Sequence, residues 1–340
     1  MNIEELVRNN IRSLAPYSTA RDEYQGDIGV YLDANESPYD NGVNRYPDPY
    51  QKKLKARISE IKGAPVENIF IGNGSDEPID LVYRVFCEPR MDNAVMIAPT
   101  YGMYRVAAAT NDVEVREALL EADFSLDADK LLAAADSKTK LLFLCSPNNP
   151  TSNSFPRKQI ADIIEKFKGI VVLDEAYIDF SAQKSFLSEL NKYPNLIIFQ
   201  TLSKAWGMAG LRVGLAFAQQ RIIELFTRIK YPYNINVITQ KMVMERLQTP
   251  VDDHVKEILA QRSRVVETIA HFPVVKRVFP SDANFILARF DHPREVYSLL
   301  IAAGVIVRDR SAMRGCEGCL RITIGTPQEN NKLIEILSRL

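Results

Sequence analysis

The feature that most constrains the fold is a series of short apolar runs, separated by longer stretches with helical spacing, between residues 69 and 217. Strands that are buried on both faces take the form of continuous runs of Val, Ile and Leu. Their alternation with helices is typical of a mostly parallel sheet that helices cover on both sides. The sequence therefore predicts an α/β fold with a seven-stranded sheet, with strands at 69–71, 94–98, 113–115, 141–145, 170–173, 196–199 and 213–217.

The pattern changes on either side of this region. Residues 3–14 have apolar side chains at helical spacing and predict a short amphipathic arm, whereas residues 31–50 are rich in Pro, Asn and Asp, as in an ordered loop. Towards the C-terminus we expect a helix at about 253–271, strands at 284–290, 305–308 and 320–324, and a helix at 327–340. The expected units are an N-terminal arm (1–29), a large domain (30–245) and a smaller α+β domain (246–340) that packs with the arm.

Composition and charge narrow the classes of function. Apolar residues make up 46% of the chain and charged residues 25%, as in a globular protein, and the net charge is −1. The charges form no block of one sign that would indicate binding to nucleic acid or to an acidic membrane. The apolar runs are far shorter than the ~18 residues that span a bilayer, and the first residues lack the pattern of a secretory signal. We therefore expect a cytoplasmic protein that binds neither nucleic acid nor a membrane.

The four cysteines are too few for a disulfide framework in a chain of 340 residues. Cys316 and Cys319 form a C-x-x-C pair, which occurs in redox sites and in halves of zinc sites. Cys87 and Cys145 lie far away in the sequence, however, and the chain has only three histidines. We therefore interpret the pair as loop thiols and expect no metal site.

Three polar motifs each follow one of the predicted strands. They are Ser146-Pro-Asn-Asn-Pro-Thr151, Asp174-Glu-Ala-Tyr177 and Thr201-Leu-Ser-Lys204. Ligands of open parallel sheets bind beyond the carboxyl ends of the strands, so these motifs are expected to converge on one site.

Asp174 and Lys204 are the candidates for chemistry at that site. A carboxylate at the end of so apolar a strand needs a cationic partner, because burial of an unpaired charge is destabilising. A ring pyridinium is one candidate for Asp174. A helix cap, an ion pair and the magnesium ligand of an ATPase are the alternatives, although the sequence has no G-x-x-x-x-G-K-[ST] loop. Desolvation of Lys204 would lower its pKa and free the amine for a Schiff base, whereas a lone lysine is usually solvated.

A set of possible phosphate ligands lies near these two residues in the sequence. Thr201, Ser203 and Arg212 flank Lys204. The loop Gly72-Asn-Gly-Ser-Asp-Glu77 precedes an apolar helix, and backbone N–H groups at a helix start bind phosphate. Glu77 occupies the place of the last glycine of the dinucleotide fingerprint G-x-G-x-x-G, so that motif is not present, and an ordinary capped turn is the alternative.

From about residue 30 to residue 325, the order and spacing of the motifs resemble the aminotransferase class of fold-type-I enzymes that depend on pyridoxal 5'-phosphate (PLP). The strings that carry the resemblance are Pro99-Thr-Tyr-Gly-Met103, Ser146-Pro-Asn-Asn-Pro-Thr151, Asp174-Glu-Ala-Tyr177, Thr201-Leu-Ser-Lys-Ala205 and Ala209-Gly-Leu-Arg212. The resemblance implies that Lys204 forms a Schiff base with the cofactor and later moves the substrate proton. It also implies that Asp174 pairs with the pyridine nitrogen, and that Tyr177 and Asn149 bond the phenolic oxygen.

The same resemblance assigns the remaining cofactor contacts. Tyr101 would stack on the ring, with a core aromatic as the alternative. The phosphate would be held by Gly74, Ser75, Asp76, Thr201, Ser203 and Arg212. Tyr46 would reach the phosphate of a partner subunit in a homodimer, with local packing as the alternative. Ser152 departs from the glycine that is usual in the family, which is expected to reshape the following turn without touching the cofactor.

Further strings resemble the subfamily of histidinol-phosphate aminotransferases. They are Leu14-Ala-Pro-Tyr17 with Ala20-Arg21, Leu32-Asp-Ala-Asn-Glu36, Arg45-Tyr-Pro-Asp48, Gly74-Ser-Asp-Glu77, Val307-Arg-Asp309 and Gly318-Cys-Leu-Arg-Ile-Thr323. Arg321 alternates with apolar neighbours in a strand, so its side chain leaves the apolar face, and a solvated strand residue is the alternative. The resemblance implies that Arg321 and Arg308 bind substrate anions, with Asn35 among the substrate contacts and Tyr17 closing over the site.

The implied reaction is transfer of an amino group between L-histidinol phosphate and 2-oxoglutarate, giving imidazole acetol phosphate and glutamate. This would be a step of histidine biosynthesis, and so of amino-acid biosynthesis. Threonine-phosphate decarboxylases and aromatic amino-acid aminotransferases share several of the strings and remain alternatives. A catalytically silent PLP-binding or regulatory module is a more remote alternative, which the presence of Lys204 disfavours.

Overall fold

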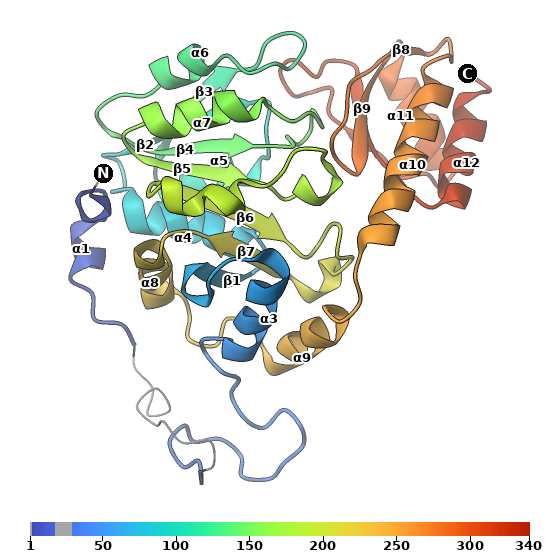
Figure 1. Ribbon diagram of the computed structural model, residues 1–340. Coiled ribbons are helices and arrows are strands. Elements are labelled where there is room, and N and C mark those ends of the chain that lie inside the picture. Colours follow the sequence, from blue (N-terminus) through green and yellow to red (C-terminus); the bar gives the residue numbers. More distant parts are fainter. Residues whose placement is uncertain (1, 18–28) are drawn as a thin grey trace.

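All seven apolar runs form strands of one sheet in the computed structural model (Figure 1), which describes residues 2–17 and 29–340. The strands are β1 (Ile69–Asn73), β2 (Asn93–Ala98), β3 (Glu114–Leu119), β4 (Thr139–Cys145), β5 (Ile170–Asp174), β6 (Leu196–Thr201) and β7 (Val213–Phe217). Their order is β1-β7-β6-β5-β4-β2-β3; β7 runs antiparallel to both of its neighbours, and the other pairs are parallel. The predicted α/β fold is confirmed.

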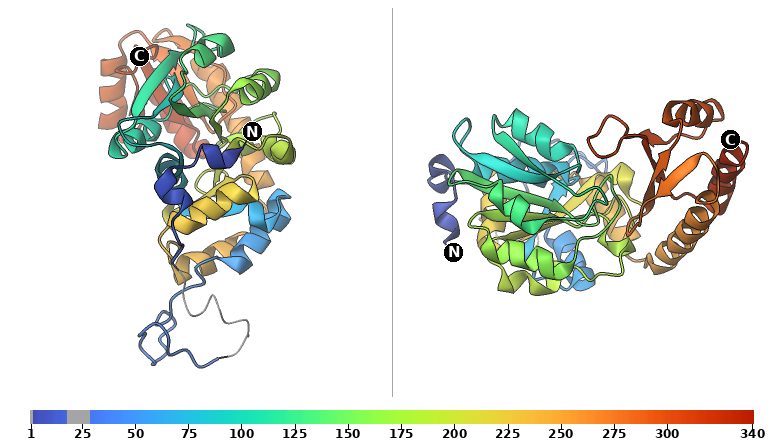
Figure 2. Two further views of the ribbon diagram at one scale, coloured as in Figure 1. Left: turned by 90° about the vertical axis from the view of Figure 1, so that its left-hand side faces the viewer. Right: turned by 90° about the horizontal axis from the view of Figure 1, so that it is seen from above.

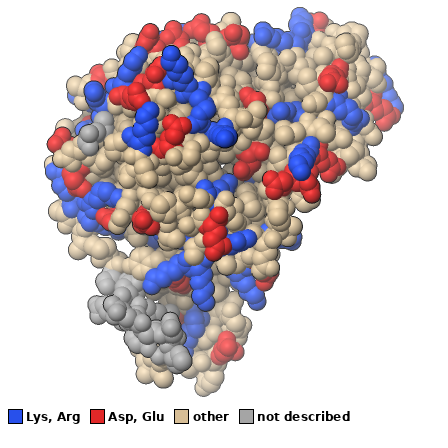
Figure 3. Space-filling model, in the orientation of Figure 1, with Lys and Arg blue, Asp and Glu red and all other residues tan. Residues whose placement is uncertain are grey.

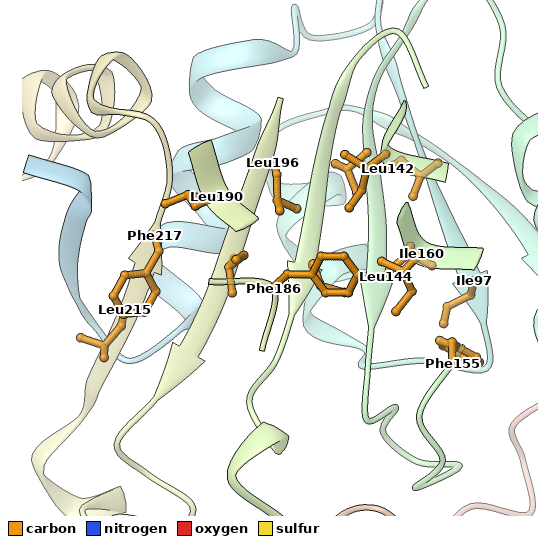
Figure 4. Packing of buried hydrophobic residues seen from close by; sticks show 14 of the residues in the cluster. Ile97, Leu142, Leu144, Phe155, Ile160, Phe186, Leu190, Leu196, Leu215 and Phe217 are labelled. Atoms are coloured by element: carbon orange, nitrogen blue, oxygen red, sulfur yellow. The ribbon is translucent and has the colours of Figure 1, made fainter. Parts of the chain in front are cut away.

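Helices cover both faces of this sheet. One face carries α4 (Asp76–Phe86), α5 (Met103–Thr110) and α8 (Gln220–Ile229), and the other carries α3 (Lys52–Lys62), α6 (Ala128–Ala133), α7 (Arg157–Lys166) and α9 (Val237–Arg246). Successive side chains of a strand point to opposite faces. Leu142 and Leu144 of β4 therefore lie near Ile160 of α7 (Figure 4), whereas Phe143 stacks on Tyr83 of α4. Burial of each such side chain contributes about 1.5–3 kcal/mol, which explains why β4 to β7 are apolar along most of their length.

The smaller domain is built on a second sheet, with strand order β10-β11-β9-β8 and antiparallel pairing throughout. Its elements are α10 (Asp252–Ile269), β8 (Val275–Val278), β9 (Phe285–Phe290), α11 (Pro293–Ala302), β10 (Arg308–Asp309), β11 (Cys319–Thr323) and α12 (Pro327–Leu337). The long helix α10 leads from the large domain into this one (Figures 1 and 2). A capping box of Thr326 and Glu329 begins α12.

Two strands of the smaller domain differ from expectation. The sequence analysis missed β8, because Lys276 and Arg277 at its centre are exposed and interrupt the apolar pattern. The strand expected at 305–308 begins only at Arg308, since residues 303–304 form the turn that follows α11 and residues 305–307 belong to no strand. Short 3-10 turns complete the connections: η2 (Val66–Asn68), η3 (Ile178–Phe180), η4 (Phe186–Lys192) and η5 (Ala209–Leu211).

The arm predicted at residues 3–14 from helical spacing consists of a 3-10 turn η1 (Ile3–Glu5) followed by the short helix α1 (Asn9–Arg12). The expected packing of the arm with the C-terminal domain is wrong for the described residues. Val7 and Ile11 are buried in the core beside α4 and α8 of the large domain, and Arg8 pairs with Glu88 at 3.2 Å. The pair Ala20-Arg21 lies outside the described residues.

Residues 29–50 contain no helix or strand, in agreement with the predicted loop, and they extend away from the large domain (Figure 1). The ion pair of Arg45 with Glu36, at 2.8 Å, joins two parts of this loop. Among the described helices, none is both long enough and apolar enough to cross a bilayer.

Candidate active site

A pocket of about 410 Å³ lies where the carboxyl ends of β4, β5 and β6 meet the smaller domain. The large domain supplies to its lining the cofactor residues that the sequence predicted, apart from Gly74 and Tyr46. The smaller domain adds Arg308, Arg310 and Arg321. Three separate strand-end motifs therefore converge on one site, as the parallel sheet requires.

Asp174 is the last residue of β5 and is 3% exposed. Its Oδ1 accepts a hydrogen bond from the Ala176 N–H at 2.9 Å, and its Oδ2 accepts one from the Tyr104 hydroxyl at 2.5 Å. Burial raises the pKa of Asp174, while these two hydrogen bonds and the charge of Lys204 act in the opposite direction. Within the described residues Asp174 has no ion-pair partner, so a cationic group in the pocket would stabilise its charged form.

Tyr104, in α5, is a site residue that the sequence analysis missed. It is fully buried, stacks on Phe143 of β4 with ring centroids 4.9 Å apart, and orients Asp174 through its hydroxyl. Tyr101, three residues earlier and ahead of α5, lines the pocket. Its ring meets that of Tyr104 edge to face, and its hydroxyl donates to Asp76 at 3.3 Å. The string Pro99–Met103 ends one residue before Tyr104, so the sequence motif gave no signal for it.

Lys204 follows β6 and directs its amine into the pocket, where Nζ lies 5.7 Å from the centre of the Tyr177 ring. Partial burial lowers the pKa of Lys204, and the positive charge of Arg321 lowers it further; the carboxylate of Asp174 acts in the opposite direction. A lowered pKa increases the fraction of neutral amine at a given pH. The geometry therefore favours a nucleophilic role for Lys204.

The start of α4 forms a cradle for an anion. Gly74 has a φ of +71°, and a Cβ atom at this position would lie 2.5 Å from the guanidinium of Arg212. A Cβ atom on Gly214 of β7 would lie 2.3 Å from the backbone nitrogen of Ser75. Arg212 is held by Asp76 at 3.4 Å. Glycines thus allow backbone N–H groups of a helix N-terminus and a guanidinium to meet at one point, which is the arrangement that binds phosphate.

A chain of polar contacts connects the two domains across the pocket. Asn149 is 5% exposed and donates to the hydroxyl of Tyr177 at 3.5 Å. The guanidinium of Arg321 donates to the Asn149 side-chain oxygen at 2.6 Å. Tyr177 in turn packs edge to face on Phe285 of β9. The residues predicted to touch the ring of a cofactor and the residue predicted to touch the substrate are therefore neighbours.

The smaller domain presents three arginines on one edge of its sheet. In the register of β10 and β11, Arg308 lies directly opposite Arg321. Arg310 extends the ladder by one step, because its N–H donates to the carbonyl of Cys319. None of the three forms an ion pair with any residue in the described ranges. Arg308 and Arg321 were predicted, but Arg310 was not.

Besides Gly74, three predicted residues do not line this pocket within one chain. Tyr17 is 71% exposed and does not line it. Asn35 and Tyr46 line a separate surface hollow with Arg45, and Tyr46 stacks on Tyr233 with ring centroids 4.4 Å apart. The roles of these residues therefore stay predictions.

Ser152 takes the place of a glycine for a visible reason. Its φ is +66°, in the region that favours glycine, and it is fully buried. Its hydroxyl lies 2.6 Å from the Thr151 carbonyl and 3.1 Å from that of Pro280, and its own carbonyl accepts from the Asp282 N–H at 2.7 Å. Ser152 thus joins the large domain to the loop before β9, and it does not line the pocket.

Cys316 and Cys319 are buried free thiols. Burial raises the pKa of Cys316 to about 12, which leaves it protonated and unreactive at neutral pH. In the part of the chain that the structure describes, no group of three or more His, Cys, Asp or Glu side chains is placed to hold a metal ion.

Comparison with known proteins assigns the class of this fold and site. The family model for aminotransferase class I and II matches residues 25–337, and the chain belongs to that family. A protein of Parabacteroides distasonis named histidinol-phosphate aminotransferase is 51% identical over 341 residues, which cover 100% of this chain and 99% of the relative. A Bacteroides fragilis protein of the same name is 53% identical over 99% of each chain.

Solved structures share the fold. The crystal structure of histidinol-phosphate aminotransferase from Clostridium acetobutylicum matches with a TM-score of 0.80 at 23% identity, covering 87% of this chain and 90% of that one. The enzyme of the same name from Sinorhizobium meliloti, in complex with pyridoxal 5'-phosphate, matches with a TM-score of 0.78 at 23% identity, covering 87% and 82%. The chain is an aminotransferase of fold type I, the class that uses PLP.

Proposed function

We propose that this aminotransferase transfers an amino group between L-histidinol phosphate and 2-oxoglutarate, giving imidazole acetol phosphate and glutamate. The observation that carries the proposal is the position of Arg308 and Arg321, which face Lys204 and Asp174 across one pocket without acidic partners among the described residues. Two arginines on one side of a pocket suit substrates that carry phosphate or carboxylate groups. The names of the full-length relatives support the same reaction.

The pocket residues fit the cofactor of the class. The cradle formed by Gly74 and the start of α4 would hold its phosphate, together with Thr201, Ser203 and Arg212. Asp174, whose pKa burial raises, gains a cationic partner in the ring nitrogen. Asn149 and Tyr177 would bond the phenolic oxygen, and Tyr101 would cover one ring face. When bound, the cofactor supplies an electron sink for the negative charge that develops on the substrate carbon.

Lys204 would attach the cofactor covalently and carry the proton of the reaction. Beside the bound substrate, Nζ of Lys204 as a neutral amine would accept the proton from the substrate carbon and hold it as an ammonium group. The lowered pKa of Lys204 suits this role, since the amine must be neutral to accept a proton. The hydrogen bonds that the two oxygens of Asp174 accept from Tyr104 and from the Ala176 N–H favour its ionised form, whereas burial raises its pKa.

Arg308 and Arg321 bind the substrates in turn. Histidinol phosphate carries a phosphate and no carboxylate, whereas glutamate carries two carboxylates. A planar guanidinium can bind either group by donating two hydrogen bonds in bidentate geometry, which a lysine ammonium cannot do. The contact of Arg321 with Asn149, at 2.6 Å, fixes the guanidinium beside the cofactor site.

The test is a panel of amino donors assayed with 2-oxoglutarate: histidinol phosphate, phosphothreonine and aromatic amino acids. We expect histidinol phosphate to give the highest kcat/KM, with glutamate formed and no carbon dioxide. Release of carbon dioxide from phosphothreonine would instead identify a decarboxylase, and faster turnover of aromatic amino acids an aromatic aminotransferase. Formation of glutamate from no donor would identify a silent binding module.

A homodimer with shared sites is part of this proposal. Tyr46 lies in the loop of residues 29–50, outside its own chain's pocket, and would contact the cofactor phosphate of a partner subunit. Mixing inactive Tyr46→Ala and Lys204→Ala subunits should restore activity, because one site of each hybrid is then complete. Hybrids that exchange subunits but recover no activity would contradict the shared site.

The proposal also includes the domain boundaries and the cellular location. We place the large domain at 30–245 and the smaller one at 246–340, which puts the division ahead of α10, with residues 1–29 as an arm. Four buried free thiols are typical of a reducing compartment such as the cytoplasm. Acidic and basic side chains are interspersed over the face shown in Figure 3, a pattern that suits small-molecule substrates and no nucleic acid or membrane partner.

A further inference from the structure

Arg310 lies in the active-site pocket but has no role in the reaction as described so far. Arg310 follows Arg308 by two residues. The pairing of β10 with β11 continues to Arg310, because its N–H donates a hydrogen bond to the Cys319 carbonyl. Residues i and i+2 of a strand face the same side, so Arg308 and Arg310 point the same way. Both line the pocket with Arg321.

Among the described residues, no carboxylate forms an ion pair with Arg310. The neighbouring charges that act on it most are the cations of Arg321 and Arg308. Cys316 and Tyr177 are its other close titratable neighbours, and burial raises the pKa of both, so they are neutral at physiological pH. The carboxylate of Asp309 accepts instead from the Ser311 N–H.

Arg310 also leaves a hydrogen-bond donor unused. Its Nε atom is buried and has no hydrogen-bond partner among the described residues. Buried donors are rarely left unpaired, because desolvation without a partner is destabilising. Like charges opposite each other in a ladder, such as Arg308 and Arg321, are also destabilising. The local structure does not explain why three guanidinium groups converge here, whereas an anionic ligand would.

The pocket's charges show which kind of anion is needed. Its lining includes Lys204 and four arginines but only two carboxylates, Asp76 and Asp174. Asp76 pairs with Arg212, and Asp174 serves the cofactor site. A monoanionic carboxylate is satisfied by one guanidinium fork. A phosphate monoester is a dianion with three free oxygens, and it can accept from two guanidinium groups of one strand face at once.

We propose that Arg310 is a specificity-determining residue that, together with Arg308, clamps the phosphate monoester of the amino donor and contributes little to binding of the carboxylate substrate. The inference rests on the proposed function for the identity of the donor. It adds a third arginine to the substrate site and assigns to it the discrimination between phosphate and carboxylate.

The first test separates the two half-reactions. Arg310→Ala should lower kcat/KM for histidinol phosphate about 10- to 100-fold and that for glutamate by less than about threefold, because only the dianion uses both arginines. Arg310→Lys should recover part of the loss, since it keeps the charge without the fork. Arg314→Ala is the matched control: Arg314 lies on the same loop, is exposed and does not line the pocket. Equal losses for both substrates, or no loss, would overturn the proposal.

The second test needs no turnover. In the cofactor-loaded enzyme the cofactor-phosphate cradle is filled, so inorganic phosphate probes the substrate site. Phosphate should raise the Tm of the wild type and of Arg314→Ala, and this increase should be lost in Arg310→Ala. Without phosphate, Arg310→Ala should melt no lower than the wild type, whereas a structural role would lower its Tm. If the wild type does not use histidinol phosphate, the proposed function is wrong. The phosphate-dependent increase in Tm still shows whether Arg310 binds phosphate.

Discussion

The two ends of the pocket are built differently. At the cofactor end, polar groups stand at the ends of strands buried on both faces and have partners within the chain: Asp174 with Tyr104, and Arg212 with Asp76. At the substrate end, Arg308 stands on a two-residue edge strand, Arg321 on its neighbour and Arg310 directly after the edge strand. None of the three has a carboxylate partner among the described residues. At the site for a bound cofactor, side chains of the protein already hydrogen-bond or pair with one another. At the site for exchanging substrates, the arginine charges are paired only when a substrate binds.

This difference has an energetic consequence. Rigid, prepaired side chains at the cofactor end hold reacting groups in fixed geometry, and their rearrangement would be costly during the reaction. Unpaired like charges at the substrate end destabilise the folded protein until a ligand binds. Enzymes commonly lose stability in this way at sites that are needed for activity. Substitutions at the two ends should therefore have effects of different kind and size.

The largest effect is expected at Lys204. Lys204→Ala should reduce kcat/KM by about 10⁴-fold or more, because it removes both the nucleophile and the proton carrier. Borohydride reduction of the wild type, followed by peptide mass mapping, should place the cofactor on Lys204. Lys256→Ala, an exposed lysine of α10, is the control and should behave as the wild type. Labelling of a different lysine, or of none, would show that the assignment is wrong.

Asp174→Asn should give the next largest loss, about 10²- to 10³-fold in kcat, because it keeps the shape of the side chain but removes the charge that faces the ring nitrogen. The affinity for the cofactor should fall as well, and fluorescence titration of the cofactor-free enzyme measures it. Tyr104→Phe removes one hydrogen bond and keeps the charge, so its loss should be about tenfold at most. A larger effect for Tyr104→Phe than for Asp174→Asn would mean that orientation, rather than charge, matters at this end.

The two ends also differ in how far the sequence predicted them. The cofactor end follows from apolar strands with polar motifs at their ends, a pattern that periodicity and topology make visible in residues such as Asp174 and Lys204. Tyr104 was missed because a buried tyrosine inside an apolar helix has the same pattern as any core aromatic.

At the substrate end, Arg310 was missed because the register of a two-residue strand depends on its pairing with β11, which the sequence does not state. The same holds for β8, whose exposed Lys276 and Arg277 hide the strand, and for the arm, whose Val7 and Ile11 pack on helices far away in the sequence. The predicted roles of Tyr17 and Asn35 in substrate binding, and of Tyr46 at the cofactor of a partner subunit, stay predictions.

Arg321→Lys tests whether the substrate end needs a fork rather than a charge. Both half-reactions should slow roughly 10- to 100-fold, equivalent to about 1.5–3 kcal/mol, because each substrate loses bidentate binding. Arg308→Ala should impair the histidinol-phosphate half-reaction more than the glutamate one. Single-turnover absorbance of the cofactor reports each half-reaction separately. Unchanged kinetics with histidinol phosphate in both variants, or faster turnover of unphosphorylated histidinol, would favour an aromatic aminotransferase.

A smaller effect is expected from the charge of Arg321, at the substrate end, on the pKa of Lys204, at the cofactor end. Arg321 lowers the pKa of Lys204, so Arg321→Gln should raise that pKa. A higher pKa leaves less neutral amine at a given pH, and the pH dependence of cofactor uptake by the cofactor-free enzyme should move to higher pH. Stopped-flow absorbance measures the uptake rate, and Arg314→Gln is the control. An unchanged pH dependence, or a shift to lower pH, would show that the charge of Arg321 does not lower the pKa of Lys204.

The smallest effect is expected at Ser152, on the seam between the two domains. A non-glycine residue at a φ of +66° is strained by roughly 1–2 kcal/mol, and the hydrogen bond of its hydroxyl offsets part of this strain with about 0.5–1.5 kcal/mol. Ser152→Gly relieves the backbone strain, which is stabilising. It also removes the hydrogen bond and increases the conformational entropy of the unfolded chain, which are destabilising, so the free energy of unfolding should change by less than about 1 kcal/mol. Ser152→Ala keeps the strain and loses the bond, so it should be less stable than both Ser152 and Ser152→Gly. Urea denaturation gives all three values, and cofactor affinity should be the same in each because Ser152 does not line the pocket. If Ser152→Ala were as stable as the wild type, the hydroxyl would not be what holds this position, and the seam would depend on the backbone bond to Asp282 alone.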